Sequence, residues 1–222
     1  MPEAPDCLLC NSSRTARTLQ DEELYTYYRC SVCKLYFAEP EQQLKPSVEK
    51  SRYDQHENHP QDPNYRRFLS QLFRPLVTLL PEKSHGLDYG SGPGPALNLM
   101  FEEAGHSVAI YDPFYADKPQ RLTQRYDFIT VSETAEHFFN PREEFDLLWS
   151  LLRPNGYLGI MTLMLQSPEQ FEQWHYRKDD THVVFYQKET FCWLAEYLNA
   201  GPPQFHGDRV CILRKRKTEI SE

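Results

Sequence analysis

The chain has 222 residues, of which 40% are hydrophobic and 25% charged, as in a soluble globular protein with room for one substantial core. Its net charge of −8 argues against strong, sequence-independent attachment to nucleic acid, which needs several Lys and Arg residues at phosphates. Without a long apolar run or a basic, secretory-type N-terminus, we expect a cytoplasmic protein with no membrane association.

Four cysteines near the N-terminus form two C-x-x-C pairs, Cys7 with Cys10 and Cys30 with Cys33. Each pair lets two thiolates converge from one tight turn, so the two pairs complete the tetrahedral shell of a zinc ion. A closed four-sulfur shell has no open position, and we therefore expect structural zinc that folds residues 1–40 without catalysing. A thioredoxin-like redox pair is the alternative.

Short strands are expected beside the second pair, at 25–29 and 35–37. A module this small cannot bury enough apolar surface unaided, which is why a metal matters. The remaining cysteines, Cys192 and Cys211, lie in apolar helix and strand contexts and are expected in the core.

Residues 41–80 are expected to form a linker or lid followed by a helix. The first part is rich in Pro, Gln, Glu and His. Tyr53, His56 and His59 belong to it, and we expect a surface loop, with a lid over the substrate as the alternative. Helical spacing of apolar residues follows, broken or kinked at Pro75.

The third part of the chain, residues 81–222, begins with a strand that runs into a glycine-rich turn. The turn reads Gly90-x-Gly92-x-Gly94. Glycine has no Cβ and tolerates positive φ, so the backbone of such a turn approaches a ligand closely. A dinucleotide fingerprint would place glycine where the chain has Pro95. Asp88, at the strand end, suits a cationic ligand group better than a pyrophosphate.

The elements after this turn alternate between helices and strands. A helix is expected at 96–104 and a strand at 107–112, which ends in Asp112, where an acid can accept hydrogen bonds from a ribose diol. The fifteen residues between Asp112 and Phe128 are too few for a full helix and strand. The later elements are a strand at 128–132, a helix at 142–152, a turn at 153–156, a strand at 157–163, an insertion at 166–187, a helix at 188–200, and a hairpin of strands 204–206 and 209–214.

This alternation predicts a doubly wound α/β sheet. Three motifs, in order, resemble those of class I S-adenosylmethionine-dependent methyltransferases: the D-x-G-x-G-x-G turn from Asp88 to Gly94, the strand ending in Asp112, and the segment 126–141 with its Glu136-His137 turn. With the amino-terminal cysteine module, the chain resembles bacterial methyltransferases of unassigned substrate. The resemblance implies a Rossmann-like sheet with a shortened or absent third strand.

The resemblance also implies the cofactors, S-adenosylmethionine and structural zinc. The residues expected to bind the methyl donor are Asp88, Gly90, Ser91, Gly92, Gly94, Asp112, Ser132 and Glu133.

The insertion resembles a Y-x-x-D-x-T-H-V-x-F segment of methyltransferases with such zinc modules. A sulfonium is already activated, so the protein mainly positions the nucleophile and removes its proton. We hypothesise that His182 is the proton acceptor, with Asp180 orienting its imidazole and Tyr176 shaping the pocket. A structural His182 is the alternative. His137 is the second candidate base, or else a helix cap.

The acceptor is expected to be a small molecule. An RNA methyltransferase that grips its substrate with the zinc module is an alternative, disfavoured by the acidic charge. Two further alternatives are an enzyme that methylates a carbon atom of a nucleotide-linked sugar and a non-catalytic zinc-module adaptor. The basic run Arg214–Lys217 is expected to be a solvated strand end, and the oligomeric state is left open.

Overall fold

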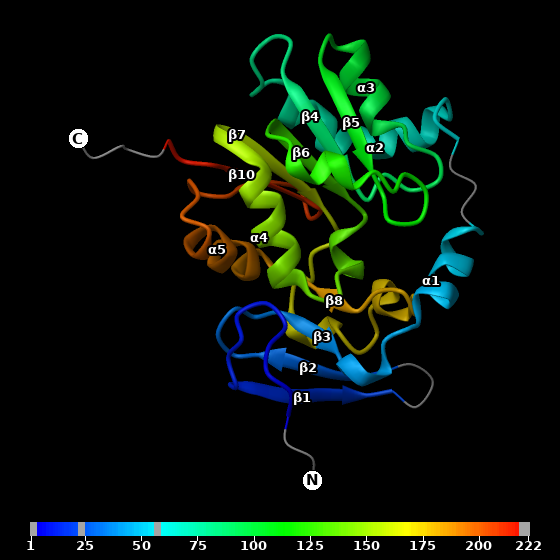
Figure 1. The fold of residues 1–222 in the computed structure, drawn as a ribbon. Helices are drawn as coiled ribbons and strands as arrows, with labels where there is room; N and C mark the ends of the chain where they lie inside the picture. Colours follow the sequence, from blue (N-terminus) through cyan, green and yellow to red (C-terminus); the bar gives the residue numbers. More distant parts are fainter. Residues whose placement is uncertain (1–3, 22–24, 56–58, 218–222) are drawn as a thin grey trace.

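The computed structural model describes residues 4–21, 25–55 and 59–217. They form a six-stranded sheet with helices on both faces and a smaller four-stranded sheet beside it (Figure 1). No helix within these ranges is long and apolar enough to cross a bilayer.

The large sheet has the order β5-β4-β6-β7-β10-β9. Its first four strands are parallel, and β10 runs antiparallel to both β7 and β9. Between β5 and β6 the chain forms only a short 3-10 helix, Pro119–Thr123, so β5 is an edge strand and the expected loss of the third strand is confirmed. The strands are β4 (His85–Tyr89), β5 (Ser107–Tyr111), β6 (Tyr126–Ser132), β7 (Leu152–Met161), β9 (Gln204–His206) and β10 (Val210–Arg214).

Two helices cover each face of this sheet. The helices are α2 (Pro63–Val77) and α3 (Leu97–Glu103) on one face, and α4 (Pro141–Leu151) and α5 (Lys188–Tyr197) on the other. Side chains of a strand alternate between the faces. Val210 and Ile212 therefore pack with α2 and α3, while Cys211 and Leu213 pack with α4 and α5. Cys211 is buried as expected, but Cys192 is exposed because it lies on the outer side of α5.

Two local expectations need correction. The expected break at Pro75 does not occur: the second helix continues to Val77, because a proline so near the helix end removes only one backbone hydrogen bond. The expected turn at 153–156 is a bulge inside β7: Leu152 pairs with Tyr126, but the next pair joins Tyr157 to Phe128.

The small sheet joins the N-terminal module to the insertion. Its order is β1-β2-β3-β8, with every neighbouring pair antiparallel. The strands are β1 (Thr15–Gln20), β2 (Thr26–Cys30), β3 (Tyr36–Ala38) and β8 (Val184–Phe185). Strand β8 comes from a remote part of the sequence and lies against β3 (Figure 1). The insertion is thus tied to the cysteine module.

A helix that the sequence did not predict, α1 (Pro46–Tyr53), lies beside the carboxyl ends of the parallel strands (Figure 1). It is held from two sides. Arg52 forms an ion pair with Asp180 at 2.7 Å, and the Tyr115 hydroxyl donates a hydrogen bond to Asp54 at 2.6 Å. Short 3-10 helices complete the fold at Pro40–Gln42, Ala135–His137, Pro168–Gln170 and His175–Lys178.

Candidate functional site

The four N-terminal cysteines converge on one point. The Sγ atoms of Cys7 and Cys33 lie 3.4 Å apart, as do those of Cys10 and Cys30, and all four lie within 4.8 Å of one another. A tetrahedral zinc ion with Zn–S bonds of about 2.3 Å separates its sulfurs by about 3.8 Å. Both of the 3.4 Å contacts join one C-x-x-C pair to the other, which fits a metal shell and disfavours the redox alternative.

The two C-x-x-C turns have the same backbone geometry. The N–H of the first cysteine donates to the carbonyl five residues on, Cys7 to Ser12 at 3.0 Å and Cys30 to Leu35 at 2.9 Å. The residue after each pair has positive φ: Asn11 and Lys34. This repeated turn is what points two thiols of each pair toward the shared centre.

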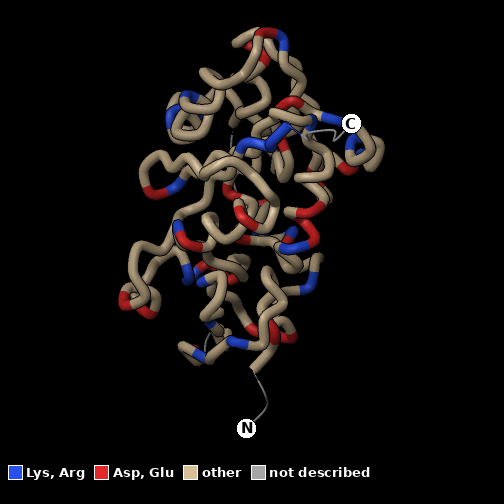
Figure 2. Tube along the Cα trace, turned by 90° about the vertical axis from the view of Figure 1, so that its left-hand side faces the viewer, with Lys and Arg blue, Asp and Glu red and all other residues tan. Residues whose placement is uncertain are grey.

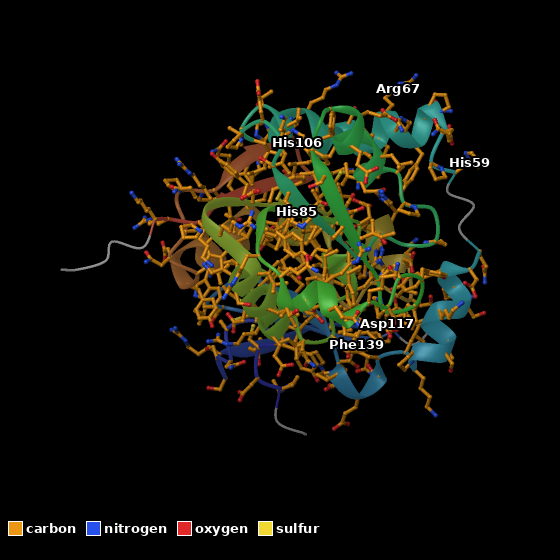
Figure 3. All side chains as sticks on the ribbon, turned by 45° about the horizontal axis from the view of Figure 1, so that its top comes forward. His59, Arg67, His85, His106, Asp117 and Phe139 are labelled. Carbon is orange, nitrogen blue, oxygen red and sulfur yellow. The ribbon has the colours of Figure 1, made fainter. Side chains whose placement is uncertain are left out.

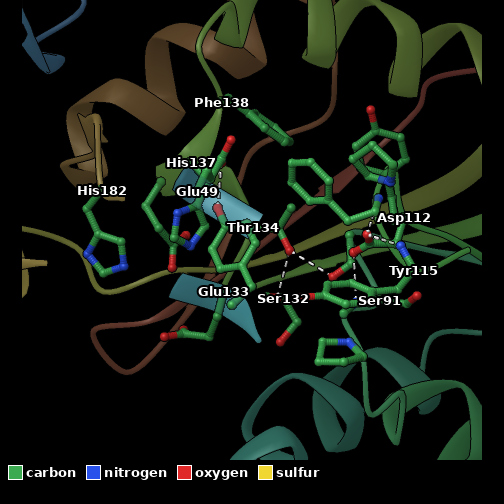
Figure 4. Close-up of a pocket in the computed structure, with 18 of the residues that line it drawn as sticks. Glu49, Ser91, Asp112, Tyr115, Ser132, Glu133, Thr134, His137, Phe138 and His182 are labelled. Carbon is green, nitrogen blue, oxygen red and sulfur yellow. Dashed lines mark hydrogen bonds between the residues drawn. The ribbon is translucent and has the colours of Figure 1, made fainter. Parts of the chain in front are cut away.

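A cavity of about 760 Å³ lies at the carboxyl ends of the parallel strands, where open α/β sheets bind ligands. It is lined by the glycine turn, the ends of β5 and β6, α1, α2 and the insertion. Figure 4 shows Ser91 and Asp112 at one end and His137 and His182 at the other.

The glycine turn needs glycine for two different reasons. Gly90 has φ +73°, and a Cβ there would lie 2.2 Å from the Thr134 side chain. Gly92 has φ +66°, but a Cβ there would meet no atom within 4 Å. Gly94 is buried and also lines the cavity. The turn thus packs against the end of β6 on one side and leaves space for a ligand beside Gly92.

The N–H groups of this turn are used within the protein. Gly90 and Ser91 donate to the Tyr111 carbonyl at 2.8 and 3.2 Å, and Gly92 donates to Asp112 Oδ2 at 2.9 Å. The turn therefore offers a ligand its Cβ-free surface instead of these three donors.

Asp112 is a buried carboxylate that organises the loop after β5. Its Oδ1 accepts hydrogen bonds from the backbone of Phe114 and Tyr115, and its Oδ2 accepts the one from Gly92. A carboxylate has about four acceptor sites, so one remains for a ribose hydroxyl.

Two hydroxyl groups in the cavity wall have no partner in the described structure: Ser91 Oγ and Ser132 Oγ are buried and unbonded. Buried polar atoms are normally satisfied, so these two fit hydrogen bonds to a bound ligand. With Asp112 and the space beside Gly92, they fit the nucleoside of S-adenosylmethionine.

Glu133, at the end of β6, also lines the cavity and has the strained φ of +46°. Burial, with the nearby Glu136 carboxylate, raises the pKa of Glu133 to about 8, although Arg209 lies 3.4 Å away.

Asp88 does not line the cavity. It is buried, and its Oδ1 accepts a hydrogen bond from Thr130 Oγ1 at 2.7 Å. Burial raises the pKa of Asp88 to about 6. Any effect of this carboxylate on a cationic ligand therefore acts through its field and not through contact.

Replacing Asp88 with asparagine is expected to stabilise the ligand-free protein. The folded-state pKa of about 6 lies above the ordinary 3.8, so the carboxyl group favours folding below pH 3.8 and loses that contribution as pH rises through 6. Urea unfolding should show an Asp88→Asn advantage that grows by about 1 kcal/mol between pH 5 and pH 7.5. An advantage independent of pH would contradict this origin.

The two candidate bases lie together, with ring centroids 4.8 Å apart. His137 Nδ1 is 2.9 Å from the Thr181 carbonyl, and His182 Nδ1 is 2.7 Å from the Tyr176 carbonyl. A carbonyl only accepts hydrogen bonds, so both Nδ1 atoms carry protons and both Nε2 atoms keep their lone pairs. Burial lowers the pKa of His137, which favours its neutral form.

The structure places the proposed supporting residues differently from the sequence hypothesis. Asp180 is paired with Arg52 and does not line the cavity; Asp179 does, with its Oδ2 3.8 Å from His182 Nε2. The Asp179 carboxylate accepts a hydrogen bond from the backbone N–H of Thr181, and in this turn the side chains of the two consecutive aspartates point in different directions. Tyr176 is buried behind the cavity wall, where its hydroxyl donates to Glu136.

Among the cavity residues that sequence reasoning did not assign to the site are four acids, Glu49, Glu136, Glu144 and Asp179. Asp179 is the aspartate of the Y-x-x-D-x-T-H-V-x-F pattern, so a signal for it was present. Nothing in the local sequence of Glu49 marks it. Tyr53, from the region expected to be loop or lid, lines the cavity as well.

The other histidines of that region lie elsewhere or are not described. His59 is exposed at the outer margin of the molecule (Figure 3). His56 lies outside the described residues.

Solved structures of similar fold include an O-methyltransferase family protein from Burkholderia thailandensis, which is 13% identical, has a TM-score of 0.52, and matches over 77% of this chain and 63% of that one. Another is an S-adenosylmethionine-dependent methyltransferase from Archaeoglobus fulgidus. It is 18% identical, has a TM-score of 0.52, and matches over 68% of this chain and 94% of that one. This chain thus spans less than two thirds of the Burkholderia protein. No match to a curated protein sequence was found.

A family model described as a methyltransferase domain matches residues 55–200, more than half of the chain. The matched region contains the glycine turn, Asp112 and both cavity histidines. The chain therefore belongs to this methyltransferase domain family, and its cavity lies on a Rossmann-like sheet.

Proposed function

We propose that the protein transfers the methyl group of S-adenosylmethionine to a small-molecule acceptor whose nucleophilic atom carries a proton. The observation that carries this proposal is the single cavity that joins the glycine turn to the two imidazoles. Its volume of about 760 Å³ lies within the usual 300–1,000 Å³ or so of small-molecule sites.

The charges of the cavity wall favour a small molecule over RNA. None of its described lining residues is Lys or Arg, whereas five acids other than Asp112 line it: Glu49, Glu133, Glu136, Glu144 and Asp179. RNA phosphates are bound mainly by Lys and Arg. Along the chain trace, Lys and Arg positions are interspersed with Asp and Glu positions in the view of Figure 2. A neutral or cationic acceptor fits this wall better than a phosphorylated one.

Each end of the cavity has a proposed role. S-adenosylmethionine supplies a methyl group on a positively charged sulfur. At one end Ser91, Asp112 and Ser132 bind its nucleoside, and the Cβ-free surface of Gly92 admits it. At the other end the acceptor is held beside the Nε2 atoms of His182 and His137, which accept its proton. The aromatic side chains of Tyr53 and other wall residues exclude water and orient the acceptor.

A labelled-methyl assay tests this function, with cell extract separated into RNA, protein and small molecules as acceptors. We expect label in the small-molecule fraction, and a loss of about 10²–10⁴-fold in turnover for His182→Asn, the usual contribution of a positioned proton acceptor. Calorimetry should show that the variant still binds S-adenosylmethionine, because His182 lies at the other end of the cavity. Label in RNA alone, or unchanged turnover of the variant, would contradict the proposal.

A further inference from the structure

Three side chains at the acceptor end of the cavity present metal-ligand atoms to one another. One donor atom each from Glu136, His137 and His182 lies within 4.8 Å of the other two. The first two residues follow β6 on a 3-10 turn, and the third comes from the insertion. A backbone hydrogen bond from Val183 to the Glu136 carbonyl, at 2.9 Å, holds the two segments together.

Each of these side chains is oriented by a partner behind it. The Tyr176 hydroxyl donates to Glu136 Oε1, and the Nδ1 atoms of His137 and His182 donate to the Thr181 and Tyr176 carbonyls. Both imidazoles are thereby fixed with the Nε2 lone pair free. Metal-binding histidines almost always donate their other ring N–H to a carbonyl or carboxylate in this way.

The buried carboxylate of Glu136 lacks a counter-charge. Its side chain is 0% exposed, its Oε2 accepts no hydrogen bond, and no Lys or Arg of the described chain lies within 4.0 Å of it. An ionised carboxylate is costly to bury unless it is paired or binds a metal. Asp179 lies 3.8 Å from His182 and adds negative charge at the same place. This environment favours a cation.

We propose that Glu136, His137 and His182 bind one divalent transition-metal ion, such as Zn²⁺. Two imidazoles and one carboxylate form a ligand set that such ions accept, and three protein ligands leave a position open for another molecule. Donor atoms around tetrahedral zinc with Zn–N bonds of about 2.0–2.1 Å lie about 3.4 Å apart, and the ligand atoms of these three side chains lie within 4.8 Å of one another.

The open position faces the cavity, because His137 and His182 both line it. An acceptor hydroxyl bound there would have its pKa lowered by the ion. With the metal in place, the imidazoles would act as its ligands instead of as proton acceptors, and the proton of the bound hydroxyl would pass to the Asp179 carboxylate, whose Oδ2 lies 3.8 Å from His182 Nε2. The metal site itself does not depend on methyl transfer and can be measured without knowledge of the acceptor.

Metal content tests the proposal on the full chain, loaded with excess zinc and then freed of weakly bound ion. We expect two zinc ions per chain, one at the cysteines and one at this cluster. The variants His137→Ala and His182→Ala should each retain one. His59→Ala changes an exposed histidine that does not line the cavity; it is the matched control and should retain two.

Cobalt substitution separates the two sites, because only the cysteine site gives sulfur-to-cobalt absorption, which both cavity variants should keep. Tyr176→Phe removes the partner of Glu136 and should weaken zinc binding at the cluster by about 10–100-fold without changing the saturated stoichiometry. A single zinc ion per wild-type chain overturns the proposal, even if a variant fails to fold. Two zinc ions in both His137→Ala and His182→Ala also overturn it.

Discussion

Replacing Cys30 with serine is expected to remove the N-terminal zinc and to lower the melting temperature by about 10 °C or more. Zinc binding in small metal modules is worth about 10–16 kcal/mol and acts directly as folding free energy. Each kcal/mol lost shifts the melting temperature of a protein of this size by about 2–4 °C. Loss of only a fraction of the zinc contribution therefore suffices for the expected change.

The effect should extend beyond the cysteine module. Cys30 and Cys33 belong to the same buried cluster as Phe37, Val184 and Met164, and β3 pairs with β8. Loosening the module therefore loosens the insertion that carries His182. Thermal unfolding with and without a chelator measures the effect. Cys192→Ser, at an exposed cysteine outside the cluster, is the control and should melt like the wild type. An unchanged melting temperature for Cys30→Ser would show that the metal contributes little to folding.

Replacing Gly90 with alanine is expected to weaken S-adenosylmethionine binding by about 10–100-fold and to destabilise the fold by about 2–4 kcal/mol. The new Cβ would lie 2.2 Å from the Thr134 side chain, at a φ of +73°. Thr134 Oγ1 donates to the carbonyls of Gly90 and Ser132, so the clash separates the glycine turn from the end of β6. The two unbonded serine hydroxyls on these segments then lose their common alignment.

Calorimetric titration and urea unfolding measure the two effects. Gly105→Ala is the matched control, because Gly105 also has positive φ, +90°, but a Cβ there meets no atom within 4 Å. The control should lose about 1–2 kcal/mol of stability from backbone strain alone and keep its affinity. Equal affinities for the two variants would refute the link between the Gly90–Thr134 contact and the cofactor site.

Features that depend on a few neighbouring residues were predictable from the sequence. The glycine turn, the cysteine pairs and the loss of the third strand follow from residue type and spacing, and the structure agrees. Of the residues proposed to bind the methyl donor, all but Asp88 line the cavity. Strand β1 escaped prediction because it lies at a sheet edge and is largely exposed, which removes the apolar alternation that marks a strand.

The direction of individual side chains was not predictable. Asp179 and Asp180 are adjacent and chemically identical, yet one faces the cavity and the other pairs with Arg52. That choice depends on α1, which is more than 120 residues away in the chain. Glu136 is a similar case, since its full burial depends on Tyr176 from the insertion.

Backbone conformation and thiol spacing are local properties of the chain, so the alternation of strands and helices, the cofactor turn and the cysteine ligand set follow from residue type and spacing. The pairing of the insertion with the cysteine module through β8, the place of α1 at the cavity, and the meeting of Glu136, His137 and His182 are visible only in the folded protein. These contacts join segments that are remote in sequence, and their formation depends on the packing of the whole core, which no local pattern records.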